Sequence, residues 1–139
     1  MVNKTLFSHK SDEWETPQDL FDKLDCEFNF NLDVCATEQN HKCKLYYTKS
    51  DDGLKQYWSY CNVWCNPPYS DIKSWVKKCS NHKGLAVMLV PARTDTKWFH
   101  EYCYNKNGVE IRFIKGRLKF SNSKNSAPFP SMIVIFRNK

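Results

Sequence analysis

Hydrophobic positions recur with helical or strand periods along most of the chain. Residues 16–36 contain a segment of each kind. Apolar residues at helical spacing fill TPQDLFDKLDCEF at 16–28, where Thr16 is placed to cap a helix and Pro17 to occupy its first position. The next apolar run, FNLDVCA at 30–36, predicts a short buried strand, and VWC at 63–65 predicts a second one.

The period becomes helical again directly after the second strand. Ile72, Trp75, Val76 and Cys79 repeat at spacings of three and four residues, which predicts a helix with one apolar face. The run GLAVMLVP at 84–91 carries no charge, as expected of a strand that is covered on both faces of a sheet.

The second half continues this alternation. The stretch 94–105 predicts an amphipathic helix, and the stretches 109–116 and 131–138 predict strands. Strands that alternate with helices indicate an α/β layer fold with a mainly parallel sheet. Ligands of such folds bind beyond the carboxyl ends of the strands, and Asn66 lies directly beyond one predicted strand.

The tetrapeptide NPPY, from Asn66 to Tyr69, is the clearest chemical signal of the chain. Pro67 and Pro68 have no N–H group and nearly fixed φ angles, so the carbonyls of this segment point in set directions. The side-chain oxygen of Asn66 and a proline carbonyl offer two acceptors to a planar amino group, and the Tyr69 ring can lie against a flat heterocycle. The alternative interpretation is a strand-to-helix turn that Asn66 caps and the two prolines stiffen.

Adenine N6 is an amino group of this kind. Its lone pair is delocalised into the ring, which makes the nitrogen a poor nucleophile. Two acceptors on its hydrogens favour a more pyramidal nitrogen and aim the lone pair at an electrophile. That would be catalysis by positioning and electrostatics.

Length and charge narrow the picture. The 139 residues correspond to about one domain, in which we expect 1–13 to be a flexible basic arm and 14–139 the folded part. A net charge of +6, with five Trp, seven Tyr and nine Phe among the basic residues, is compatible with binding to a polyanion. A lysine-rich surface that only solubilises the protein would have the same charge.

The seven cysteines include no C-x-x-C pair, so free thiols in a reducing cytosol fit better than disulfides or a zinc site, and we expect no metal. No charged-then-apolar leader opens the chain, and no apolar run approaches the roughly 18 residues of a membrane span. We therefore expect a cytoplasmic protein with no membrane partner. The sequence does not indicate an oligomeric state.

The NPPY motif after a strand resembles the signature of amino-group methyltransferases that use S-adenosyl-L-methionine. The longer pattern resembles the phage-type DNA N6-adenine methyltransferases, in runs that include LDVCAT, DDGL, VWCNPPYS, VMLVPARTDTKWFH, IKGRLKF and APFPSMIVIF between Trp14 and Phe136. The resemblance implies a single-domain, Rossmann-like methyltransferase fold of reduced size, with helices on both faces of the sheet. It also implies S-adenosyl-L-methionine as cofactor and DNA as partner, in the host cytoplasm if a phage encodes the protein.

Asp33 matches, within this resemblance, the acidic residue that opens the cofactor loop, and Val34, Cys35 and Ala36 follow it beside the methionine part of the cofactor. The family's loop carries glycines, whereas none of the four glycines of this chain follows Asp33. The small Ala36 would then have to allow the close approach of the cofactor.

Three further positions match the cofactor site of the family. Thr16 and Pro17 correspond to the segment that touches the methionine carboxylate, and this role is compatible with Thr16 being a helix cap. Asp52 of DDGL corresponds to the acidic residue that receives the adenine amino group of the cofactor. Asp-Asp-Gly is also an ordinary turn sequence.

The target base would be held by aromatic residues. Phe120 resembles the residue that packs on the second face of the base, although a phenylalanine at a strand end is also a typical core residue. An extruded adenine would stack on Tyr69. Arg117, Lys119 and Lys124 are candidates to meet phosphates, or are simply solvated.

The resemblance predicts a DNA adenine-N6 methyltransferase, and two alternatives stay open. The same motifs serve enzymes that methylate RNA bases or a glutamine amide, and a catalytically silent nucleic-acid-binding module would keep the fold. No side chain has to act as a base, so we expect no essential histidine, His100 included. No separate recognition domain fits the length, so any sequence preference would come from 116–130 or from the arm before Trp14.

Overall fold

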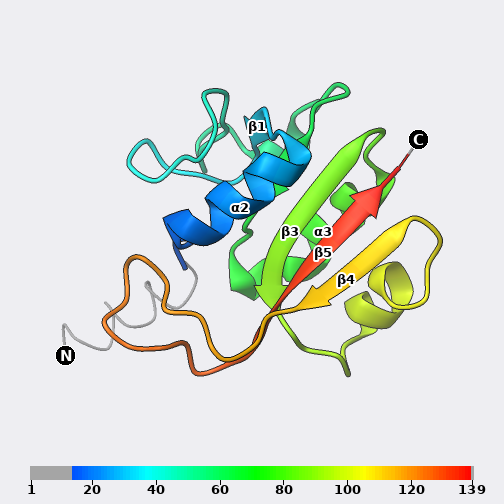
Figure 1. Cartoon of the computed structure of the whole chain (residues 1–139). Helices are drawn as coiled ribbons and strands as arrows, with labels where there is room; N and C mark the ends of the chain where they lie inside the picture. Colours follow the sequence, from blue (N-terminus) through cyan, green and yellow to red (C-terminus); the bar gives the residue numbers. More distant parts are fainter. Residues whose placement is uncertain (1–13, 139) are drawn as a thin grey trace.

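A five-stranded sheet in the order β1-β2-β3-β5-β4 organises residues 14–138, which are the residues that the computed structural model describes. The arm expected at 1–13 lies outside them. The strands are β1 (Leu32–Asp33), β2 (Val63–Cys65), β3 (Leu85–Pro91), β4 (Val109–Phe113) and β5 (Ser131–Arg137). β1, β2 and β3 pair in parallel, whereas β5 pairs antiparallel with both β3 and β4 (Figure 1).

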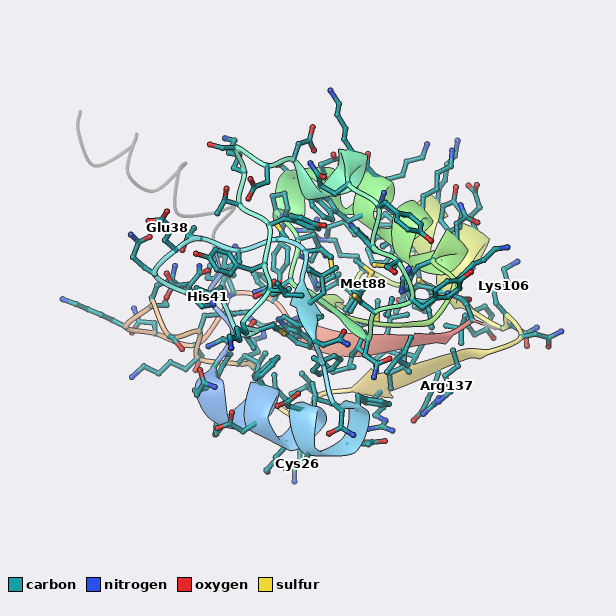
Figure 2. The ribbon with its side chains drawn as sticks, turned by 90° about the horizontal axis from the view of Figure 1, so that it is seen from above. Cys26, Glu38, His41, Met88, Lys106 and Arg137 are labelled. Carbon is teal, nitrogen blue, oxygen red and sulfur yellow. The ribbon has the colours of Figure 1, made fainter. Side chains whose placement is uncertain are left out.

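One α-helix covers each face of the sheet. Figure 2 shows α2 (Gln18–Phe28) on one side of the strands and α3 (Ile72–Asn81) on the other. Phe21 of α2 packs edge-on against Trp64 of β2, with ring centroids 5.4 Å apart. The apolar face of α3, predicted from its spacing, is buried as expected. The α/β prediction is therefore confirmed, but the expectation of a mainly parallel sheet needs correction, because the sheet is parallel at one end and antiparallel along the longer pairings at the other.

The centre of the sheet is the core. β3 and β5 are buried along almost their whole length, as expected of interior strands in a sheet that has α2 on one side and α3 on the other. Met88 lies in the middle of this arrangement (Figure 2) and has no exposed surface. Uncharged runs in the sequence therefore correspond to strands with no solvent face.

The chain between β1 and β2 contains little regular structure. From Val34 to Asn62 the structure has one 3-10 turn, η1 (Gly53–Lys55), and an isolated parallel bridge between Asp33 and Tyr46. Loops of this length inside a compact domain are commonly functional. This one borders the carboxyl ends of β1 and β2, as the cyan segment beside β1 in Figure 1 shows.

Two sequence predictions for helices need correction. The helix expected at 94–105 is reduced to the single π-helical turn η3 (Phe99–Cys103) after two helical residues, because the amide of Tyr104 bonds back to the carbonyl of Phe99 at 2.8 Å. Thr16 is not the cap of α2. Pro17 holds the capping position, and its carbonyl accepts from the amide of Phe21 at 3.1 Å.

The end of α2 is tied to the antiparallel edge of the sheet by charge. Arg112 of β4 donates two hydrogen bonds of 2.7 Å to Glu27 and one of 2.6 Å to Glu110, and Arg137 donates to Glu110 at 2.7 Å. The Arg112 guanidinium lowers the pKa of Glu27 below its ordinary value. These groups are about half exposed, so the network mainly fixes the orientation of the helix.

No helix within residues 14–138 is both long and apolar enough to cross a membrane.

Candidate active site

A cleft with a volume of about 260 Å³ opens where β1 and β2 end. Asp33 at the end of β1 and Asn66 directly after β2 both line it. The loop 34–37 supplies a second wall, the segments 14–16 and 48–53 supply others, and Trp75 reaches in from α3. Parallel strands place their carboxyl ends at one edge of a sheet, which is why two residues 33 positions apart meet here.

The side-chain amide of Asn66 is held from one side only. Its Nδ2 donates to the backbone carbonyl of Trp14 and, at 3.0 Å, to Oγ1 of Thr16. The Trp14 carbonyl can only accept, so the nitrogen of the amide must face it. The orientation of the amide is therefore determined, and Oδ1 points away from Trp14.

Oδ1 of Asn66 is buried and has no hydrogen-bond partner among the residues that the structure describes. A buried acceptor without a donor costs about 1–3 kcal/mol, so this is an unusual atom. It belongs to a residue that lines the cleft. A ligand with an N–H group would supply the missing donor.

Asp33 is a buried carboxylate that supports the loop after β1. Its Oδ1 accepts from the amide of Cys35 at 3.3 Å, and its Oδ2 accepts from the amide of Lys42 at 3.0 Å. Burial raises the pKa of Asp33 to about 6, while these two hydrogen bonds and the charges of His41 and Lys42 lower it. A carboxylate with only 3% of its surface exposed, at the wall of a cleft, is suited to a positively charged ligand.

Val34, Cys35 and Ala36 line the cleft, and their contact with a cofactor stays a prediction. Burial raises the pKa of Cys35 to about 12, so its sulfur stays a neutral thiol and a poor nucleophile. A different close contact, between two parts of the backbone, joins this loop to Gly53. A Cβ on Gly53 would lie 2.2 Å from the Val34 carbonyl, so only glycine fits at that position.

Asp52 and Thr16 both line the cleft, whereas Pro17 is not part of its wall. Asp52 precedes the η1 turn with a positive φ of 57°, so the turn interpretation of DDGL is confirmed, and the carboxylate also borders the cleft. Thr16 is 3% exposed, and its hydroxyl is the acceptor that helps to hold Asn66.

The two aromatic residues expected at the target base are buried together beside the cleft. Tyr69 is 7% exposed and Phe120 1% exposed, and their ring planes are inclined at 75° with centroids 6.5 Å apart. Phe129 packs against both rings, at 5.7 Å and 6.1 Å, and Trp14 packs on Phe120 at 5.2 Å. Rings at this angle cannot both lie flat on one base, so base binding would require this aromatic cluster to rearrange.

The loop that carries Phe120 and Phe129 is docked on the start of the described chain. The amide of Ser121 donates to the Glu15 carbonyl at 2.9 Å, and its hydroxyl donates to the Thr16 carbonyl at 3.2 Å. In Figure 1 this loop, drawn in orange, lies beside the first turn of α2. Arg117, Lys119 and Lys124 are exposed on the same loop, where phosphates would be accessible to them.

Sequence reasoning missed Trp14, Lys42 and Trp75 as residues of the cleft. Lys42 and Trp75 lie close in sequence to candidates already chosen, but no motif marked them. Trp14 begins the stretch that resembles the family but was given no role, because its contact with Asn66 joins residues 52 positions apart. Within 14–138 the structure contains no group of three potential metal ligands, and each of the seven cysteines is a free thiol.

The described residues form an α/β sheet with a cleft at the carboxyl ends of its strands, and Asn66, whose side-chain oxygen is buried without a hydrogen-bond partner among them, lines this cleft. Comparison with known proteins identifies the family. The sequence model of the DNA N-6-adenine-methyltransferase (Dam) family matches residues 3–139, and the chain belongs to this family.

Two phage proteins are similar to the chain. The DNA N-6-adenine-methyltransferase of Escherichia phage T1 is 35% identical over 112 residues, which cover 77% of this chain and 46% of that protein. The DNA N-6-adenine-methyltransferase of Haemophilus phage HP1 is 34% identical over 151 aligned positions, which cover 100% of this chain and 86% of that protein. The chain thus spans about half the length of the T1 relative and most of the HP1 relative.

The raised pKa of Asp33 predicts a pH dependence of stability. The folded pKa of about 6 lies above the ordinary value of 3.8, so the folded chain holds the proton more tightly than the unfolded chain does. The contribution of Asp33 to the free energy of unfolding is fully present below pH ~4. It is lost as the pH rises through about 6, by about 3 kcal/mol in total. Urea unfolding at several pH values should show this loss in the wild type but not in Asp33→Ala. Parallel pH profiles of the two proteins would contradict the assignment.

Proposed function

We propose that this protein transfers a methyl group from S-adenosyl-L-methionine to N6 of an adenine in DNA. The observation that carries the proposal is the buried Oδ1 of Asn66, which belongs to a residue of the cleft wall and has no hydrogen-bond partner within residues 14–138. An adenine amino group would donate one hydrogen to it. The family and the names of the two phage relatives support adenine in DNA as the acceptor.

The second acceptor of the proposed site is the carbonyl of Pro67. The carbonyl of Pro68 already accepts from the amide of Asp71 at 3.1 Å as the η2 turn (Tyr69–Asp71) begins. Two acceptors hold the two hydrogens of the amine, and the nitrogen lone pair then points away from both acceptors. Trp14 and Thr16 keep the Asn66 oxygen in place, so no reorganisation is needed during the reaction.

The residues of the cleft fit S-adenosyl-L-methionine. This cofactor supplies, when bound, a methyl group on a positively charged sulfur. Asp33 would provide a buried negative charge close to a cationic ligand, and Thr16 would remain close to its methionine part. Asp52 would accept from an amino group, beside the flat apolar wall formed by Trp75. A reduced Rossmann-like arrangement of these elements is part of the proposal.

No side chain is required to act as a base, because the nitrogen can release its extra proton to water after the transfer. The placement of His100 agrees with the absence of a catalytic base in the proposal. Its Nε2 lies 2.8 Å from the Thr94 carbonyl, and the residue is not part of the cleft wall. We therefore expect replacement of His100 to leave the chemistry intact.

The base would be turned out of the duplex, because N6 lies in the major groove and a concave site cannot surround it there. Tyr69 and Phe120 would then hold the ring after Phe129 moves aside, and Arg117, Lys119 and Lys124 would contact phosphates. Acceptors other than DNA, such as an RNA base or a glutamine amide, would use the same Asn66 oxygen. A silent binding module would have no use for an unpaired acceptor that costs stability.

Replacement of Asn66 tests the chemistry. Asn66→Ala should lower methyl transfer to DNA by about a hundredfold or more, the usual scale for one well-placed polar group in a transition state. Its affinity for S-adenosylhomocysteine, measured by calorimetry, should stay close to that of the wild type. Asn81→Ala, at the exposed end of α3, serves as the control and should change neither quantity. Full activity of Asn66→Ala would mean that NPPY is only a turn.

Replacement of Tyr69 tests the stacking role. Stacking on an aromatic side chain is worth about 1–3 kcal/mol per base, so Tyr69→Ala should weaken catalysis while Tyr69→Phe keeps most of it. The Tyr69→Phe control loses only the hydroxyl bond to the Leu89 carbonyl, which is 3.4 Å long. 2-Aminopurine at the target position should become brighter when wild-type protein and a cofactor analogue are added. An unchanged fluorescence, together with full activity of Tyr69→Ala, would remove both base flipping and stacking from the proposal.

A further inference from the structure

The ammonium group of Lys78 contacts the loop between β1 and β2 in an unusual way for a helix lysine. From α3 its Nζ donates to the carbonyl of Leu54 at 2.9 Å and to the carbonyl of Gln56 at 2.7 Å. It also lies 4.9 Å from the centroid of the Trp58 ring. A lysine that serves only solubility leaves its charge in water, whereas this one binds two backbone carbonyls and an aromatic face.

The same turn is fixed from two other directions. The indole Nε1 of Trp58 donates to the Gly53 carbonyl at 2.9 Å and is buried. The Cα of Gly53 is pressed against the β1 loop, because a Cβ there would lie 2.2 Å from the Val34 carbonyl. Lys78 and Trp58 thus bond to backbone carbonyls in and next to the η1 turn, and Val34 packs against its first residue. Asp52 enters this turn with a φ of 57°. A non-glycine residue persists in that conformation only where its surroundings determine it.

The turn matters for function because Asp52 and Gly53 line the cleft. In the proposed reaction the methyl donor must present its reactive end beside Asn66, where the amine is held. The remainder of the donor then extends along the other walls. Asp52 offers an acceptor for an amino group or hydroxyl, and Val34 and Trp75 offer apolar surface for a flat ring.

We infer that Lys78 is a positioning residue for the cofactor: it holds the Asp52–Gly53 turn in the shape that receives the adenosine half of the ligand. The inference rests on the proposed function. Lys78 does not line the cleft itself, so its effect passes through the turn. The Asp52 carboxylate is close enough to raise the pKa of Lys78, although burial is the larger effect and lowers it.

The test measures binding of S-adenosylhomocysteine and of adenosine by calorimetry, well below the melting temperature of each variant. Lys78→Met keeps the aliphatic stem on Trp58 and removes the donors. It should lower the affinity for both ligands about tenfold, because the charge-assisted hydrogen bonds that shape the site are lost. Lys78→Arg, which retains donors and charge, should restore most of the affinity. Lys77→Met, at an exposed position on the same helix, should bind like the wild type.

Two further readouts separate positioning from simple stabilisation of the fold. In methyl transfer to DNA, Lys78→Met should raise the KM for the cofactor about tenfold and leave kcat nearly unchanged. In an Asp52→Asn background the same substitution should have a much smaller effect on adenosine binding, because both residues act through one turn. A residue that only supports the fold would lower the melting temperature and leave this coupling near zero.

The outcomes are distinct. No binding of S-adenosylhomocysteine to the wild type would overturn the proposed function, and the inference with it. Normal binding by the wild type and equal binding by Lys78→Met would overturn the inference alone. If Lys78→Met fails to fold, Trp58→Phe replaces it, since it removes the indole bond to the Gly53 carbonyl of the same turn and keeps an aromatic side chain beside Lys78. That variant should lower the affinity for adenosine about fivefold, which corresponds to the loss of about one hydrogen bond. Unchanged affinity would overturn the inference.

Discussion

The site depends on the orientation of one amide group. The side-chain nitrogen of Asn66 donates to Trp14 and Thr16 in the segment that precedes α2, and its oxygen is buried without a donor among residues 14–138. A protein gains nothing in stability from such an atom, since leaving it unpaired costs about 1–3 kcal/mol. Three separate regions nevertheless keep it there. They are the end of β2, residues 14–16, and the loop whose Ser121 bonds to Glu15 and Thr16. Stability is given up at the position where a ligand would restore it.

The same three regions also control access to the aromatic residues beside the cleft. Phe129 and Phe120 cover the Tyr69 ring, and Trp14 packs on both phenylalanines. The segment that orients Asn66 is therefore also part of the cover over the place where a base would stack. The 116–130 loop and the Asn66 amide are joined through residues 14–16, because Ser121 bonds to Glu15 and Thr16 while Trp14 and Thr16 accept from Asn66.

Sequence patterns predicted those parts of the fold that burial alone determines. β3 was evident because a strand covered on both faces contains no charge, β5 because of its apolar run at 132–136, and α3 because its apolar residues share one face. The stretch 94–105 has the same helical spacing, but it forms only one π-turn after two helical residues, since hydrogen bonds local to that loop end it early. Thr16 was expected to cap α2, and its hydroxyl instead bonds to Asn66, a partner 50 residues away that no local rule reveals.

Site residues were predictable where a motif concentrates them. Asp33 and Asn66 follow predicted strands, and Asp52 stands in a recognisable turn. Trp14 and Lys78 were not predictable, because each acts through backbone atoms that only the folded chain brings near. Gly53 was visible as a turn residue, but its close approach to Val34 depends on how the loop packs against β1.

The central claim is that the Asn66 oxygen receives an adenine amino group of DNA. It is tested most directly by incubating the wild-type protein with S-adenosylmethionine labelled in its methyl group, in parallel reactions with DNA, RNA and a protein extract. The products are then digested and identified by mass spectrometry. The account predicts label in N6-methyl-2′-deoxyadenosine from the DNA reaction. Label in a cytosine, in RNA or in a glutamine amide, or no label from a protein that binds the cofactor product, would contradict it.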